Sequence, residues 1–322
     1  MTEFAKFIVK KTFFPAILIG FLIISSFFYE LKPVSTVASS KIFEISPGDG
    51  FFEIAWRLKA DKLIRSPFVF KTYSIFAGSA GKIKPGIYEL SDISSTPEII
   101  DILTRGALEA EVVIPDGASI YDVDSLLSGK KILPAGILVS FSEKNGIEGK
   151  LYPDTYRFFE HSTVESVINK FLDNFRAKAE PLLNRDPINY KKNLILASLV
   201  QKEVSDEKDS RIVAGILKKR LASGMKLDVD ATICYLKKTL KGQANCYPLE
   251  SDDFQIDSRY NTYLYAGLPP GPISNPNAAA ISSVLNSLPS PYWFYLSDPK
   301  TGKTIFSKTL DEQSANRRIY FK

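Results

Sequence analysis

The chain has 322 residues, of which 45% are hydrophobic and 24% charged, so it is long enough for two or three folded domains and is not a disordered segment. Its formal net charge of +5 is too small to indicate nucleic-acid binding, and no basic run is interleaved with aromatic residues. The single histidine, His161, argues against a multi-histidine metal site and against Ser-His-Asp catalysis. We expect no metal, no cofactor and no nucleic-acid partner.

Residues Thr12–Tyr29 form a run of 18 uncharged residues near the N-terminus. At about 1.5 Å per helical residue, this run is just long enough to cross the hydrocarbon core of a bilayer. Three lysines precede it and only one follows closely, so the positive-inside rule keeps the N-terminus in the cytoplasm. We expect residues 1–32 to form a cytoplasmic tail and a single transmembrane helix in the inner (cytoplasmic) membrane, with the remaining chain periplasmic or otherwise extracytoplasmic. The alternative is a cleaved signal peptide, although "STVASS" is a poor cleavage site.

An internal repeat follows. The segments "EISPGDGFFEIAWRLKADKLI" and "VIPDGASIYDVDSLLSGKKIL" align without gaps at an offset of 69 residues. Matched positions include Ile45 with Ile114, Gly48 with Gly117, and Leu58 with Leu127. Each copy predicts a strand, a turn with glycine and an amphipathic helix. Between the copies, the pattern predicts a strand, a loop and a helix capped near Thr96 with Pro97 in its first turn.

Both copies of the repeat resemble LysM modules, which bind glycans that contain N-acetylglucosamine. The alternative is that these small units serve only as scaffold, since each has an apolar face to bury. We expect a linker and a LysM-like α/β module at 33–108. A second LysM-like repeat at 112–133 then opens a mixed α+β domain at 109–322.

From about Ile147 the pattern changes to longer helices separated by dense loops. Helices are expected in "SVINKFLDNFRAKAEPLL", up to its proline, and in "DSRIVAGILKKRLASGM", with Gly224 as C-cap. In "SNPNAAAISSVLNSL", Asn275 is the expected N-cap and Pro276 the first helical residue. "YWFYLSD" and "KTIFSKT" predict a hairpin. The two cysteines, Cys234 and Cys246, are too few for a disulfide framework, and the sequence leaves open whether they pair.

A carboxylate interrupts the apolar face of one helix. In "NLILASLVQKEV", Leu196, Leu199 and Val200 repeat at helical spacing, and the next position on that face is Glu203. Desolvation there would raise the pKa of the carboxyl group above its usual value of about 4.3, so that it could donate a proton to a glycosidic oxygen. The alternative is a buried structural glutamate that pairs with Lys or Arg, or caps another helix.

Two further stretches are richer in polar and aromatic groups than folding requires, "IEGKLYPDTYRF" and "RYNTYLYAGLPPGPISNP". Their candidate substrate-binding residues are Glu148, Tyr152, Asp154, Tyr156, Tyr260, Asn261 and Tyr263. Aromatic rings pack on the apolar faces of sugars, while amides and carboxylates bond to hydroxyl groups. The proline-rich loop after Tyr263 is stiff enough to shape a cleft.

These stretches resemble the MltG (YceG-like) family of membrane-anchored endolytic murein transglycosylases, and the resemblance covers nearly the whole chain. Its most specific parts are "EGKLYPDTY", "ASLVQKEV", "LKKRLASGMKLDVDAT" and "YNTYLYAGLPPGPISNP". The family's catalytic acid is the second glutamate of an E-K-E segment, which implies Glu203, while Gln201 replaces the first glutamate.

The family's D-P-T segment reads Asp230, Ala231 and Thr232 here, which adds Asp230 and Thr232 to the candidate substrate-binding residues. Histidines that are common in the family near the C-terminus are replaced by Thr304 and Gln313.

The resemblance implies cleavage of nascent peptidoglycan strands between MurNAc and GlcNAc to leave 1,6-anhydro-MurNAc ends. Such an enzyme would terminate glycan chain elongation beside peptidoglycan synthases. Two alternatives stay open. One is a hydrolytic muramidase, for which Asp154, Asp228 and Asp230 could supply the second carboxylate. The other is a membrane-anchored, non-catalytic scaffold that binds peptidoglycan.

Overall fold

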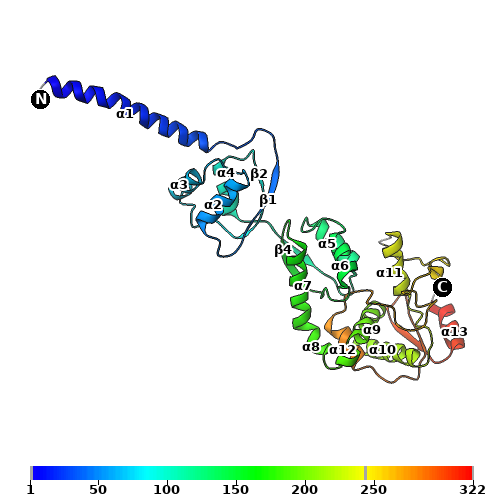
Figure 1. Cartoon of the computed structure of the whole chain (residues 1–322). Helices are drawn as coiled ribbons and strands as arrows, with labels where there is room; N and C mark the ends of the chain where they lie inside the picture. Colours follow the sequence, from blue (N-terminus) through cyan, green and yellow to red (C-terminus); the bar gives the residue numbers. More distant parts are fainter. Residues whose placement is uncertain (1–2, 243–244, 321–322) are drawn as a thin grey trace. The chain divides into compact units, whose positions relative to one another are not determined.

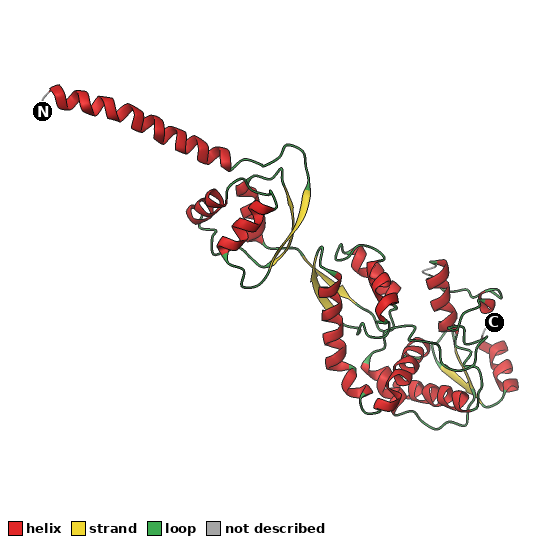
Figure 2. Ribbon diagram, in the orientation of Figure 1, coloured by secondary structure: helices red, strands yellow, loops and turns green. Residues whose placement is uncertain are grey.

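The computed structural model describes residues 3–242 and 245–320, without the side chains of residues 3–14, 16 and 241. The chain folds into two compact units, Met1–Ala110 with Phe159–His161, and Glu111–Phe158 with Ser162–Lys322. Helices dominate both units, and the sheets of the described residues have two strands each (Figure 1, Figure 2). The predicted mixed α+β class is confirmed.

The first unit builds one small core around a two-stranded sheet. Its elements are α1 (Glu3–Glu30), β1 (Ser40–Ile45), α2 (Phe51–Ala60), α3 (Pro67–Phe76), β2 (Gly86–Ser91) and α4 (Thr96–Arg105). β1 and β2 are antiparallel, with Phe43 opposite Tyr88. Both rings are buried with Leu58 and Phe70 of the helices. α4 starts where the sequence predicted, because Ser95 and Glu98 form a capping box.

α1 covers the predicted membrane span Thr12–Tyr29. Within this span, the structure does not describe the side chains of residues 12–14 and 16. In the part of the chain that the structure describes, no helix combines the length and the apolar character that crossing a membrane requires. The span stays a prediction.

The remaining elements surround a second and larger core. They are β3 (Glu109–Val113), α5 (Ile120–Gly129), α6 (Ile137–Asn145), β4 (Thr155–Phe159), α7 (Val164–Lys178), α8 (Glu180–Leu183), the 3₁₀ helix η1 (Pro187–Asn189), α9 (Tyr190–Glu203), α10 (Glu207–Ala222), α11 (Asp230–Lys241), the 3₁₀ helix η2 (Asp253–Gln255), α12 (Ala278–Leu285), β5 (Phe294–Ser297), β6 (Thr304–Ser307) and α13 (Leu310–Tyr320). β3 pairs with β4, and β5 with β6. The latter pair is the predicted hairpin.

The internal repeat is confirmed in the backbone as β1 followed by α2 and β3 followed by α5. Gly48 and Gly117, which the alignment matches, both have positive φ, 96° and 72°. After each helix, Lys62 and Lys131 occupy matched positions and also have positive φ, 58° and 56°. Two non-glycine residues in this sparsely populated region at the same repeat position indicate one shared turn geometry.

α9 lies at the centre of the second core, where it contacts α8, α10, α11 and α12. Every residue from Asn193 to Val200 is buried. A helix that is buried on all sides needs apolar or hydrogen-bonded residues all round, which explains why this stretch is rich in Leu, Ile and Ala. The C-terminus of α9 therefore brings Glu203 to a junction between several elements.

Two predicted caps were wrong, and the first is at α10, whose C-cap is Ser223 and not Gly224. The N-cap of α12 is Asn277, whose side chain accepts a hydrogen bond from the Ala280 N–H, so the helix starts two residues after Pro276. Asn275 is fully buried, and its amide group accepts from the Leu151 N–H at 2.7 Å and donates to the Ala118 carbonyl at 2.8 Å. The side chain therefore joins distant segments and cannot cap a helix.

Replacing Gly215 by alanine should destabilise the second unit. A Cβ at this position of α10 would lie 2.0 Å from the Leu288 carbonyl oxygen, which belongs to a backbone segment. Overpacking of this kind costs about 2 kcal/mol or more. Gly129, at the end of α5, has nothing within 4 Å of its built Cβ, so Gly129→Ala is the matched control. Urea unfolding of the two variants should give a lower free energy of unfolding for Gly215→Ala alone; equal values would contradict the close approach.

Candidate active site

Glu203 is the last residue of α9 and keeps a partly exposed side chain. The Tyr295 hydroxyl group and the Ala231 backbone N–H lie near its carboxyl group as donors, and both lower the pKa of Glu203. Burial raises the pKa of Glu203 to about 7, a shift that the neighbouring Asp230 increases and the bond from Tyr295 moderates. The group can therefore hold a proton near neutral pH and also exist as a stabilised carboxylate, as a general acid and base requires.

Tyr295 comes from the C-terminal hairpin and was not found from the sequence, since nothing in "YWFYLSD" marks one aromatic residue as a partner of Glu203. The Gln313 side-chain amide on α13 donates to the Tyr295 carbonyl at 2.9 Å, and the Ser307 hydroxyl donates to Gln313 at 2.9 Å. Gln313, which the resemblance places where a family histidine is expected, thus holds the strand that carries the Tyr295 hydroxyl. At the other replaced position, the buried hydroxyl of Thr304 has no hydrogen-bond partner among the described residues.

Asp230 and Tyr263 complete the surroundings of Glu203. Asp230 is the first residue of α11, and the Tyr263 hydroxyl donates to its carboxylate. Burial raises the pKa of Tyr263, which keeps the phenol protonated, and the negative charge of Asp230 acts in the same direction. Among the substrate-binding candidates predicted from the sequence, Asp230 and Tyr263 lie near Glu203.

A buried arginine supports the same region. Arg220 of α10 donates to the carbonyl groups of Trp293 at 2.8 Å and Leu227 at 2.6 Å, and its charge lowers the pKa of Glu203 slightly. Its guanidinium group lies 3.8 Å from the Asp228 carboxylate. Burial nevertheless raises the pKa of Asp228. Arg220 links α10 to the hairpin and was also missed from the sequence.

Thr232 and Asn261 are fully buried and position the backbone around Asp230. The Thr232 hydroxyl donates to the Val229 carbonyl at 2.7 Å, and its oxygen lies 3.0 Å from the Thr262 hydroxyl. The Asn261 amide donates to two loop carbonyl groups at 3.0 and 2.9 Å. These bonds give both residues a structural task, while their predicted contact with substrate stays a prediction.

Glu148 and Tyr260 form a second cluster with different partners. The Glu148 carboxylate accepts from the Ile120 N–H at 3.0 Å and from the Asn275 amide at 3.3 Å, and the nearby Tyr235 hydroxyl lowers the pKa of Glu148. Burial raises the pKa of Glu148 to about 8. The Tyr260 and Tyr235 rings have their centroids 5.2 Å apart. Glu148 is thus a buried residue that ties the second repeat to the loop before α12.

Tyr152, Asp154 and Tyr156 meet α7 and not Glu203. Asp154 forms an ion pair with Lys178 and accepts from the Asn174 amide at 2.8 Å, and these contacts lower the pKa of Asp154 to about 2. The Tyr156 hydroxyl donates to the Tyr152 carbonyl at 2.6 Å. Since these polar atoms already bond within the fold, the substrate-binding role of the three residues stays a prediction.

A cavity of about 280 Å³ is lined by residues that neighbour Glu203, while Glu203 itself is not part of its lining. Its lining includes Ala231, whose N–H bonds to Glu203, and Lys202, the residue before Glu203. Tyr247 also lines it; burial raises the pKa of the Tyr247 phenol, and the charges of Asp230 and Glu203 act in the same direction. Residues that neighbour Glu203 therefore line a space for part of a ligand.

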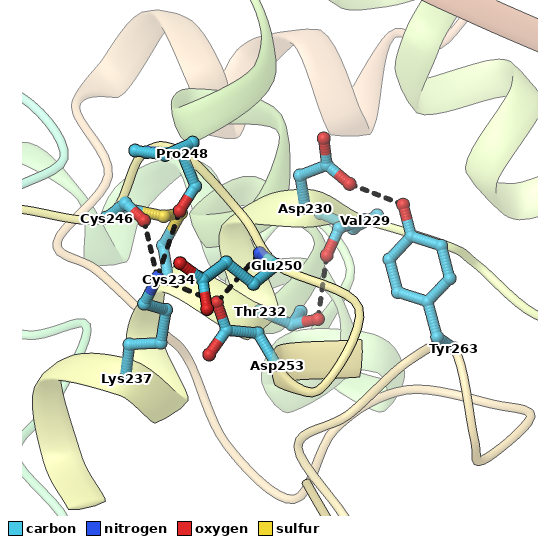
Figure 3. The surroundings of a disulfide bond; sticks show 10 residues. All are labelled: Val229, Asp230, Thr232, Cys234, Lys237, Cys246, Pro248, Glu250, Asp253 and Tyr263. Atoms are coloured by element: carbon cyan, nitrogen blue, oxygen red, sulfur yellow. Dashed lines mark hydrogen bonds and ion pairs between the residues drawn. A yellow bond between two sulfur atoms is a disulfide. The ribbon is translucent and has the colours of Figure 1, made fainter. Parts of the chain in front are cut away.

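A disulfide forms one wall of this cavity and joins Cys234 of α11 to Cys246 (Figure 3). The pairing that the sequence left open is thus present. The Lys237 ammonium group donates to the Cys246 carbonyl at 2.9 Å and forms a buried ion pair of 2.7 Å with Asp253. The loop that contains Tyr247 is consequently tied to α11 by a covalent bond and by a buried charge pair.

Comparisons with known proteins agree with these observations. The YceG-like family profile matches residues 43–319. The chain is 26% identical over 326 residues to an endolytic murein transglycosylase of Bacillus subtilis (strain 168), covering 90% of this chain and 88% of the relative. It is also 26% identical to a protein of the same name from Streptococcus pneumoniae serotype 2 (strain D39), covering 84% of this chain and 57% of the relative.

Among solved structures, a yceG-like protein from Listeria monocytogenes matches with a TM-score of 0.54 and 26% identity. The match covers 87% of this chain and 100% of that chain. The extent of the profile match, together with this shared fold, establishes that the chain belongs to the YceG-like family.

Proposed function

We propose that the protein is an endolytic murein transglycosylase that cleaves peptidoglycan glycan strands, with Glu203 as its catalytic acid. The observation that carries the proposal is a partly exposed carboxyl group that has a pKa of about 7 and whose neighbours Lys202 and Ala231 line a cavity. Relatives that match over most of this chain bear the name of that activity.

One carboxyl group can perform both halves of the reaction. Glu203 first donates its proton to the glycosidic oxygen between MurNAc and GlcNAc, and the bond from this oxygen to the anomeric carbon of MurNAc breaks. The Tyr295 hydroxyl group and the Ala231 N–H stabilise the resulting carboxylate. This carboxylate then takes the proton of the MurNAc 6-hydroxyl group as that oxygen bonds to the anomeric carbon. The product is a 1,6-anhydro ring, Glu203 is protonated again, and no water is consumed.

A hydrolytic muramidase is the second candidate, because Asp230 lies close enough to Glu203 to raise its pKa. A hydrolase uses a second carboxylate as base for water or as nucleophile. The hydrogen bond from Tyr263 occupies one oxygen of Asp230, which favours a supporting role over that of a nucleophile.

The proposal extends to the place of action. The exposed apolar side chains of α1, which include Ile17, Phe21, Ile24 and Phe28, and the preceding lysines support a single span in the cytoplasmic membrane. The LysM-like repeats would hold glycan outside the cytoplasm. Cleavage there would terminate elongation of nascent strands beside the peptidoglycan synthases.

Glu203→Gln should lower cleavage by at least about 100-fold, because an amide cannot donate the proton that general acid catalysis requires. Mass spectrometry of glycan ends released from uncross-linked strands by the full chain tests this. Wild-type protein should produce ends lighter by one water than reducing MurNAc. Glu207→Gln, on the exposed first turn of α10, is the charge-matched control and should cleave normally. Undiminished cleavage by Glu203→Gln would reject the assignment, and reducing ends would indicate a hydrolase.

Tyr295→Phe should move the high-pH limb of the cleavage rate to higher pH. The Tyr295 hydroxyl bond lowers the pKa of Glu203, so its removal leaves the carboxyl protonated over a wider range. Initial rates between about pH 5 and 9 test this, a range that brackets the raised pKa. Tyr292→Phe is the control, because Tyr292 stacks on Phe306 and is not a partner of Glu203. A shift in both variants, or in neither, would argue against the contact.

Because Glu203 titrates, the free energy of unfolding should fall as pH rises. The folded-state pKa of Glu203, about 7, lies above the ordinary value of 4.5, so the folded protein binds the extra proton and loses this advantage between pH 4.5 and 7. At about 1.4 kcal/mol per pKa unit, the loss is up to about 3 kcal/mol. Glu203→Gln removes the titration. Its free energy of unfolding relative to wild type should therefore be higher at about pH 8 than at about pH 5; a constant difference would contradict the raised pKa.

A further inference from the structure

α2 and α3 expose large apolar side chains that the core of the first unit does not use. These are Phe52, Trp56, Phe68, Ile75 and Phe76, with exposed fractions between 63% and 86%, and we call them the aromatic face. Single exposed apolar residues are common, whereas a group of five on two neighbouring helices indicates an interaction surface.

Helical spacing and side-chain contacts make the aromatic face continuous. Phe52 and Trp56 lie one turn apart on α2, while Phe68, Ile75 and Phe76 share one side of α3. Trp56 and Phe68 line one groove together with apolar side chains of α1, among them Leu22 and Ile23. The Lys71 ammonium group of α3 lies 3.7 Å from the centroid of the Phe52 ring. The opposite sides of α2 and α3 are buried, so the aromatic face stays exposed beside α1.

The charges around this face are mostly positive. Residues 51–76 contain five basic and two acidic side chains, and neither Asn nor Gln. Arg65, between the helices, lies 4.9 Å from the Tyr29 ring centroid and donates to the Pro33 carbonyl at 2.7 Å, so the face adjoins the end of α1. Aromatic residues with Lys and Arg are typical of segments that lie at a membrane interface.

We propose that the aromatic face binds the surface of an anionic lipid bilayer and inserts its rings at the level of the headgroups. The location rests on the membrane anchoring included in the proposed function. Lipid is favoured over glycan because the aromatic face combines aromatic rings, one isoleucine and nearby basic groups, and residues 51–76 contain no amide side chains to bond sugar hydroxyls. Docking would fix the orientation of the first unit on the membrane that α1 enters.

Tryptophan fluorescence tests the proposal directly, since the chain has two tryptophans, Trp56 in the first unit and Trp293 in the second. Trp293→Phe leaves Trp56 as the reporter, and Trp56→Phe leaves Trp293. Both full-length variants are reconstituted in phosphatidylglycerol-containing vesicles with or without lipids brominated near the headgroup. We expect a blue shift and at least twofold quenching for Trp56 and little for Trp293. Water-exposed, unquenched Trp56 in vesicle-bound protein would overturn the docking.

Paired substitutions identify the surface. In the Trp293→Phe background, Phe68→Ser with Phe76→Ser should lose most of the Trp56 quenching. Ile188→Ser, at a residue 93% exposed in the second unit, should keep it. Equal quenching in all variants would overturn the proposal, as would protection of Trp56 by soluble glycan strands and not by vesicles. Failure of the full chain to sediment with vesicles would reject the membrane anchoring as well, whereas the Glu203 cleavage assay tests the enzymatic proposal separately.

Discussion

The partial burial of the Glu203 carboxyl group is the constraint on which the candidate active site depends. Burial makes the ionised form of Glu203 costly in free energy. The fold must therefore supply donors that stabilise the carboxylate and still keep the pKa high enough for the carboxyl group to bind a proton near neutral pH. Tyr295 and the Ala231 N–H provide these donors, while Asp230 raises the proton affinity. The balance puts the pKa near 7, where an acid that must later act as a base is most effective.

The surrounding elements hold these few atoms in place. α9 is buried along most of its length, so Glu203 cannot move without disturbing the core of the second unit. The hairpin that brings Tyr295 is fixed by Gln313 on one side and Arg220 on the other. The loop with Tyr247, which lines the adjoining cavity, is held by the Cys234 disulfide. Segments from four parts of the second unit thus converge on one carboxyl group.

Two glutamines at which the resemblance implies a departure from the family pattern make local contacts. Gln201 is expected in place of a family glutamate, and its side-chain oxygen accepts from the Asn277 N–H at 3.0 Å. A neutral acceptor therefore joins α9 to the cap of α12 without adding a second negative charge beside Glu203. Gln313, in place of a histidine, acts through the backbone of Tyr295 and not on the reacting groups.

The sequence alone determined the repeat, most helices and the hairpin, because each is encoded in local spacing, such as glycines 69 residues apart and apolar positions at helical intervals. It also drew attention to Glu203 on an apolar face, while the role of Glu203 as the acid is implied by the family resemblance and belongs to the proposed function. Only the tertiary structure decided which side chains contact one another. Asp230 and Tyr263 lie with Glu203, whereas Asp154 pairs with Lys178, although both aspartates belong to motifs of equal clarity. Tyr295 carried no signal at all. Hydrogen bonds between residues far apart in the chain depend on how helices pack, and periodicity cannot specify that packing.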